Sequence, residues 1–223
     1  MQKISSRINR SVIGSTLGPL ICAGFLAAPS AAPAADFTGV WLATTPRSGI
    51  GANQPELTPR ARADLDAFDP LSDPVIRCVS PGFPRTGLVI YPFEIVQTED
   101  LVVFLYEVFG MVRRIRIEGG SPPDYLPPAR TGYSVGHWEQ DELVVDTTHV
   151  ESGLLSGGGI LQYGDVSVLE RYSLSDDGQI LEAEVTITAP ETFVAPWIRH
   201  FTWELDPDGM IFDAPCDPAD SRF

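Results

Sequence analysis

From Pro92 onward, apolar and polar residues alternate with a period of two, and turn residues interrupt the alternation at short intervals. This pattern is typical of antiparallel strands that bury one face. The predicted turns lie at residues 99–100, 109–110, 140–141, 175–178 and 206–209. The sequence therefore predicts a mainly β fold with about eight strands.

The first two turns fix the register of three strands and agree on which face is buried. A turn at 99–100 places Ile95 opposite Phe104, and a turn at 109–110 places Tyr106 opposite Arg113. A slip of one residue would exchange the two faces, so the agreement between two turns is informative. The predicted inner face then carries Phe93, Ile95, Gln97, Val102, Phe104, Tyr106, Met111, Arg113 and Ile115.

The later hairpins extend the same inner face. The turn at 140–141 places Ser134 and Thr147 on it, and the turn at 175–178 places Glu170 opposite Ala183. The last strand adds Trp197, Arg199, Phe201, Trp203 and Leu205.

Strands of this kind hide their apolar faces in a single antiparallel up-and-down β-barrel or a strongly rolled sheet, with a sandwich as the alternative. In an up-and-down order, the short turns at 109–110, 140–141, 175–178 and 206–209 share one end. The long connections at 118–132, 149–164 and 189–196 share the opposite end. Long loops gathered at one end of a barrel mark its predicted mouth.

Residues 35–91 are rich in proline and glycine, and they predict an irregular segment packed on the barrel with one short N-terminal helix at 57–68. Thr58 can cap this helix, and Pro59 suits its first turn. The predicted barrel domain spans 92–213, and 214–223 form a C-terminal tail.

Residues 1–34 are typical of a secretory signal peptide. Three bases, Lys3, Arg7 and Arg10, precede an apolar stretch at 12–28, and Ala-Pro-Ala at 32–34 forms a small-x-small cleavage site. The alternative is a membrane anchor, but the apolar stretch is short and interrupted. We therefore expect a periplasmic or secreted protein without membrane insertion after signal removal.

The mature chain keeps two cysteines, Cys78 and Cys216. In an oxidising compartment, two thiols indicate one disulfide. Because this disulfide would close a long loop, it would stabilise the folded chain by about 4–5 kcal/mol. The alternative is two separate buried thiols. With no CxxC motif and three histidines, the sequence implies no metal site and no cofactor.

The charge balance disfavours two kinds of negatively charged partner. The chain has 30 acidic and 15 basic residues, for a net charge of −15. Nucleic acids and anionic membrane surfaces both require clustered positive charge. We therefore expect neither as a partner, while the sequence leaves the oligomeric state open.

Residues 37–41, Phe-Thr-Gly-Val-Trp, resemble the Gly-x-Trp opening of lipocalin-type barrels. The resemblance agrees with the strand pattern. It implies that a small apolar molecule binds inside a barrel.

A longer set of motifs covers most of the mature chain. They are Leu-Thr-Pro at 57–59, Asp-Pro and Arg-Cys within 73–78, Pro-Gly-Phe-Pro-Arg at 81–85, Tyr-Pro-Phe-Glu-Ile-Val-Gln at 91–97, Leu-Tyr-Glu at 105–107, Val-Arg-Arg-Ile at 112–115, Ser-Val-Gly-x-Trp-Glu at 134–139, Leu-Val-Val-Asp-Thr at 143–147 and Glu-Arg-Tyr at 170–172. This set resembles a family of secreted bacterial proteins of unknown function, so it implies no reaction. Tyr133 and Tyr163 stand where the family pattern has histidines.

The predicted inner face carries Arg113, Glu170 and Arg199, with Tyr106 and Tyr172 nearby. Burying an unpaired charge is costly, so these residues need a reason to be there. One interpretation is a salt bridge between Arg113 and Glu170 that fills the barrel floor at the short-turn end. The other is a pocket where Arg113 holds an anion or polarises a carbonyl and Glu170 or Tyr106 transfers a proton.

The candidate site residues follow from these two interpretations. The candidate catalytic residues are Tyr106, Arg113, Glu170 and His149. The candidate ligand-binding residues are Arg199, Trp197, Tyr172, Tyr133, Thr147 and Phe104. For His149, a solvated loop position is the alternative.

Three functions are consistent with these observations. The first is a secreted barrel that binds a small, largely apolar organic molecule, aromatic or terpenoid-like, in a cavity at the long-loop end. The second is a cofactor-independent lyase, isomerase or hydrolase that acts on such a molecule in the same cavity. The third is an envelope protein whose acidic outer face binds another protein.

Overall fold

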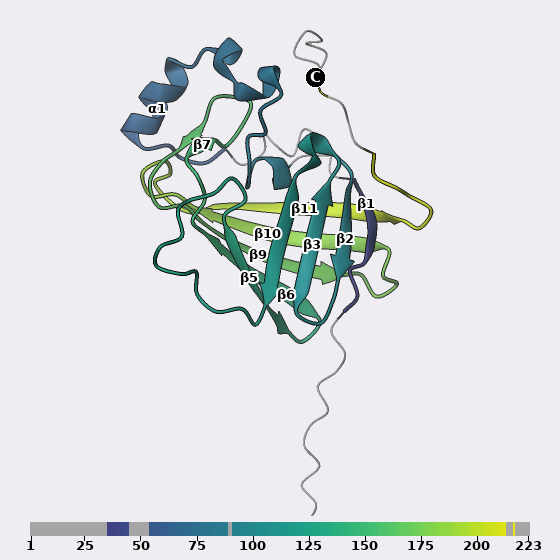
Figure 1. Ribbon diagram of the computed structural model, residues 1–223. Helices are drawn as coiled ribbons and strands as arrows, with labels where there is room; N and C mark the ends of the chain where they lie inside the picture. Colours follow the sequence, from purple (N-terminus) through teal and green to yellow (C-terminus); the bar gives the residue numbers. More distant parts are fainter. Residues whose placement is uncertain (1–34, 45–53, 89–90, 213–215, 217–223) are drawn as a thin grey trace, which may run out of the picture. The chain divides into compact units, whose positions relative to one another are not determined.

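The computed structural model describes residues 35–44, 54–88, 91–212 and 216, so the predicted signal segment at 1–34 and most of the tail at 214–223 lie outside the described residues. The fold is mainly β, and nine strands form a closed barrel (Figure 1). In barrel order they are β1 (Gly39–Ala43), β11 (Trp197–Asp206), β10 (Ile180–Thr188), β9 (Ser167–Leu174), β6 (Glu142–Thr148), β5 (Tyr133–Glu139), β4 (Val112–Ile117), β3 (Leu101–Tyr106) and β2 (Phe93–Gln97). Two short strands, β7 (Gly153–Leu154) and β8 (Leu161–Gln162), pair separately.

The barrel has nine strands rather than about eight because β1 lies within the segment that was expected to be irregular. Trp41 pairs with Leu205 of β11 on one side and with Phe93 of β2 on the other. Its side chain is 1% exposed, and its ring nitrogen donates a hydrogen bond to the Phe37 carbonyl oxygen at 2.9 Å. The Gly-x-Trp segment thus supplies the strand that closes the barrel.

The expected up-and-down order fails at one point, because β4 and β5 pair in parallel through Ile115 and Ser134. Residues 118–132 must therefore carry the chain from one end of the barrel back to the other. We call the end where β1, β3, β6 and β10 finish the cap end. The turn at 107–110 lies at the cap end with the connections at 149–166 and 189–196, not opposite them as predicted.

The predicted register is confirmed for two hairpins and wrong by two residues for two others. Phe93 pairs with Tyr106 and Trp138 with Leu143, as the two-residue turns predict. In the β3–β4 hairpin, Phe104 rather than Tyr106 lies opposite Arg113, because the loop has four residues and forms the 3-10 turn η5 (Val108–Gly110).

In the β9–β10 hairpin the four-residue loop lies one residue later than predicted, and this also moves the register by two residues. Ser175 pairs with Ile180 across a four-residue loop, and the Asp177 carboxylate accepts hydrogen bonds from the Ser175 hydroxyl and the Gln179 amide. Glu170 therefore lies opposite Val185 instead of Ala183. A shift of two residues preserves side-chain direction, so the predicted inner faces are correct.

Residues 54–88 cover the cap end. Thr58 caps helix α1 (Pro59–Asp66) by accepting a hydrogen bond from the Ala61 amide at 3.2 Å, which confirms the predicted helix with slightly shorter bounds. Leu57 forms a β-bridge with Phe193, so the segment is attached to the loop between β10 and β11. Three 3-10 turns follow: η2 (Pro70–Ser72), η3 (Pro74–Arg77) and η4 (Thr86–Leu88).

The predicted disulfide between Cys78 and Cys216 is confirmed. It joins the segment that covers the cap end to the chain beyond β11. Figure 1 shows this last part of the chain, in yellow, turning back after β11 and running toward the same end as α1. None of the helices in the described ranges is long and apolar enough to cross a membrane.

Candidate functional site

An ion pair lies inside the barrel between Arg113 of β4 and Glu170 of β9, and each residue is 1% exposed. Arg113 Nη1 donates to Glu170 Oε1 at 2.9 Å, and Nη2 donates to Oε2. This is the two-point geometry in which a guanidinium binds a carboxylate most strongly.

Hydroxyl groups from three strands complete the hydrogen bonding of the pair. Arg113 Nε donates to Ser134 Oγ at 3.1 Å, and Nη2 donates to Thr147 Oγ1 at 2.7 Å. These two hydroxyls lie 2.9 Å from each other. The Tyr172 hydroxyl donates to Glu170 Oε1 at 2.6 Å. We call Arg113, Glu170, Ser134, Thr147 and Tyr172 the buried polar network.

The network shifts the pKa values of its members in ways that follow from burial. Burial, reinforced by the charge of Glu170, raises the pKa of Tyr172 well above its ordinary value. Burial also raises the pKa of Tyr106 to about 12, although the neighbouring Arg113 opposes this change. Burial alone would lower the pKa of Arg113, but the charge and hydrogen bonds of Glu170 outweigh it and raise that pKa.

Residues 54–88, which cover the cap end, also cover one face of the network. The Phe83 ring lies 3.8 Å from the Arg113 guanidinium carbon and is 1% exposed. Phe83 is held there because its amide donates to the Arg130 carbonyl oxygen at 2.7 Å. The network lies beneath the cap end and not at the short-turn end, where the pair was predicted. The reason is that Arg113 follows the turn at 107–110, and this turn is at the cap end.

This arrangement holds two opposite charges in the buried core and satisfies their hydrogen bonds, as a structural ion pair requires. Arg113 uses Nε, Nη1 and Nη2 on protein partners, which leaves little of the guanidinium to bind an added anion. The geometry favours the structural interpretation of the pair. A catalytic role for Tyr106, Arg113 and Glu170 stays a prediction.

Of the ten predicted site residues, the structure places six together at the network. The other four lie apart from it: Arg199, Trp197, Tyr133 and His149. Tyr106, Arg113, Glu170, Tyr172, Thr147 and Phe104 all lie on the inner face, and Phe104 packs against Tyr172 with ring centroids 5.5 Å apart. Arg199 is also on the inner face, two strands from Glu170, and stacks between Trp197 and Phe201 at 4.8 and 4.7 Å.

The two remaining predicted residues lie away from the network. Tyr133 faces outward, where Arg116 stacks on its ring at 4.6 Å and its hydroxyl donates to the Gly120 carbonyl oxygen. His149 follows β6 in a left-handed conformation, with φ at 55°, and its Nδ1 lies 3.0 Å from the Thr148 hydroxyl.

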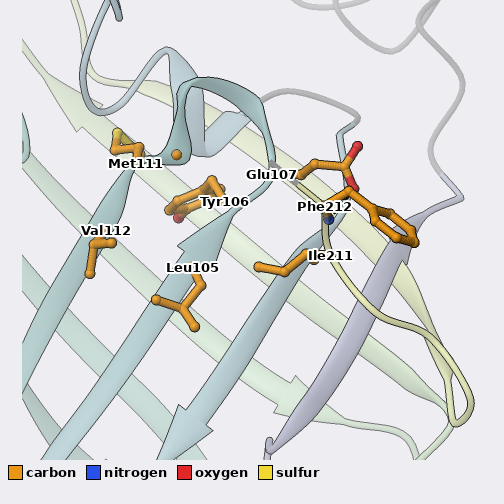
Figure 2. Close-up of a pocket in the computed structure, with 8 residues that line it drawn as sticks. Leu105, Tyr106, Glu107, Met111, Val112, Ile211 and Phe212 are labelled. Carbon is orange, nitrogen blue, oxygen red and sulfur yellow. Dashed lines mark hydrogen bonds between the residues drawn. The ribbon is translucent and has the colours of Figure 1, made fainter. Parts of the chain in front are cut away.

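A pocket of about 260 Å³ lies on the outer wall near the cap end (Figure 2). Leu105 and Val112, paired across β3 and β4, form its floor. Ile211 and Phe212, from the chain beyond β11, form the opposite side. Its lining also includes Tyr106, Glu107, Gly110 and Met111. We call this cavity the side pocket.

Sequence reasoning did not identify the side pocket or Phe83. The alternation predicts that Leu105 and Val112 face outward, but nothing in the pattern shows that residues 211–212 return to cover them. Phe83 lies in a segment without periodicity, so no signal places it on Arg113. Ser134, in contrast, could be found from its inner position beside Thr147.

No protein-family model and no curated protein matches this chain. Among the described residues, no three histidine, cysteine or carboxylate side chains gather in a group that could hold a metal ion. The fold and the site define the chain as a closed β-barrel protein with a packed polar network inside and an apolar pocket on its wall.

Proposed function

We propose that the protein is a secreted or periplasmic β-barrel that binds a small, largely apolar organic molecule in the side pocket. The observation that carries this proposal is the pocket itself, about 260 Å³ in volume and lined by aliphatic and aromatic side chains. Pockets for drug-sized ligands start at about 300 Å³, so the side pocket suits a slightly smaller molecule such as a two-ring aromatic.

The proposed location of the ligand differs from the barrel interior that the sequence indicated. The inner-face side chains are mostly buried and in contact; for example, Phe104, Tyr106 and Trp203 are at most 4% exposed. A packed interior of this kind acts as a core that supports the wall. The wall then presents Leu105 and Val112 as a fixed surface against which a ligand can lie.

The disulfide supports the proposed location outside the cytoplasm, because structural disulfides form and persist in oxidising compartments. The basic, then apolar, N-terminal sequence is consistent with the same location. We also propose membership of the secreted bacterial family that the motifs at 57–172 resemble.

The proposal is tested with prodan, a neutral two-ring dye whose emission shifts to shorter wavelength when it leaves water. We expect saturable binding to the mature protein and at least a tenfold loss in Val112→Trp, because the indole would fill the pocket. Leu169→Trp is the matched control, since Leu169 also faces outward on the wall but is 37% exposed and outside the pocket. Unchanged dye binding by a folded Val112→Trp variant would refute the proposal.

A further inference from the structure

Among the described residues that line the apolar side pocket, one carries a carboxylate. Glu107 precedes η5, is half-buried and lines the pocket. Its Oε2 accepts a hydrogen bond from the Phe212 amide at 3.3 Å. Among the described residues no cation forms an ion pair with Glu107, so none of them neutralises its negative charge.

An aromatic ring lies beside this carboxylate. Phe212 is 65% exposed, so its ring remains accessible although its amide is bound. Figure 2 shows the Glu107 and Phe212 side chains together on one side of the pocket, with Val112 on the far side. A carboxylate and an aromatic face are the two groups that proteins use to bind an organic ammonium.

We propose that the ligand of the side pocket is an organic amine whose ammonium group binds between Glu107 and Phe212. The inference rests on the proposed function and adds the charge of the ligand to it. The apolar part of the amine would lie on Leu105, Val112 and Ile211, while its N–H groups donate to the free Glu107 oxygen lone pairs. No covalent step is involved.

The charges around the pocket are compatible with a cation. Glu94 lies opposite Leu105 on the outer face of β2, and Arg114 is two residues beyond Val112 on β4. In the described ranges, the wall next to the pocket thus carries Glu94 and Arg114, of opposite sign, in addition to Glu107. The net charge of −15 raises the local concentration of cations around the whole molecule.

Three probes of nearly equal shape test the inference by calorimetry at neutral pH and low salt: 1-naphthylmethylamine, 1-naphthylmethanol and 1-naphthoic acid. We expect the amine to bind at least tenfold more tightly than the alcohol, and the acid to bind most weakly. Glu107→Gln should reduce the advantage of the amine to less than twofold and leave alcohol binding unchanged. Glu182→Gln, which removes one acid from the outer face of β10, should keep the tenfold advantage.

The outcomes separate this inference from the proposed function. Equal binding of amine and alcohol by the unmodified protein, or a tenfold amine advantage that survives Glu107→Gln, would overturn the amine inference and leave the apolar site intact. Loss of alcohol binding in Glu107→Gln would also overturn it, because Glu107 would then only position Phe212. If none of the three probes binds, the proposed function itself fails.

Discussion

Replacing Arg113 with methionine tests whether the buried polar network is a structural ion pair. Methionine has a similar length and no charge, so the substitution leaves the Glu170 carboxylate buried with one hydrogen bond, from Tyr172. Ser134 and Thr147 lose Arg113 but keep each other at 2.9 Å. The main consequence is therefore an unpaired buried charge.

The magnitude follows from that unpaired charge. Removing one partner of a buried ion pair costs about 3–5 kcal/mol of unfolding free energy. Both groups here are 1% exposed, so solvent screening offers little relief. For a chain of this size, a loss of about 4 kcal/mol corresponds to a decrease in melting temperature of roughly 8–16 °C.

The assay is urea unfolding of the disulfide-bonded protein at neutral pH, followed by tryptophan fluorescence. The double variant Arg113→Met/Glu170→Gln is the matched control, because it removes both charges while the glutamine oxygen can still accept from Tyr172. We expect the double variant to lose about 2 kcal/mol or less, so that the second substitution restores stability.

Two results would refute this reasoning. A loss below about 1 kcal/mol in Arg113→Met would mean that water reaches Glu170, so the network would not be a closed core. A double variant at least as unstable as the single one would mean that the unpaired charge is not the cause of the loss.

Three further predictions concern pH and the disulfide. Burial would raise the pKa of Asp73, but hydrogen bonds from Arg85 and the Val75 amide outweigh burial and lower that pKa. Asp73→Asn should therefore cost about 2 kcal/mol of unfolding free energy at pH 7. In urea unfolding, this cost should become progressively smaller below about pH 4, where the wild-type carboxylate is protonated. The pKa of Tyr106 is raised from 10.0 to about 12, so the unfolding free energy of the protein should decrease as pH rises from 10 to 12. The unfolding free energy of Tyr106→Phe should decrease less steeply over the same pH range. Cys78→Ala/Cys216→Ala should cost about 4 kcal/mol and, in limited proteolysis, expose the chain after Asp206 to cleavage; unchanged cleavage would contradict this.

The hydrophobic pattern predicted the strand faces well because side-chain direction depends only on whether a shift is odd or even. The β3–β4 and β9–β10 registers are both wrong by two, so Arg113 and Glu170 still point inward. The β3–β4 loop was predicted two residues too short, and the four-residue β9–β10 loop was placed one residue too early. Side-chain hydrogen bonds within the turn, as at Asp177, do not register in a hydrophobic pattern.

The parallel pairing of β4 with β5 could not be predicted from the sequence. A connection as long as 118–132 can either turn back beside its strand or cross to the other end, and both choices bury the same apolar face. The side pocket depends on this kind of long-range information too. Ile211 and Leu105 both line it, and neither residue's neighbours in sequence indicate that the two lie at the same pocket.

The short strand β1 has a consequence for how the protein is made. It leaves the ribosome before every other strand of the described barrel, yet it must pair with β11, which is the last of them. The barrel therefore cannot close before β11 has been made, and a chain without β1 would leave the edges of β2 and β11 unpaired. Unpaired edges can add strands from other chains, so a shortened protein beginning after Ala43 should form oligomers through these two edges.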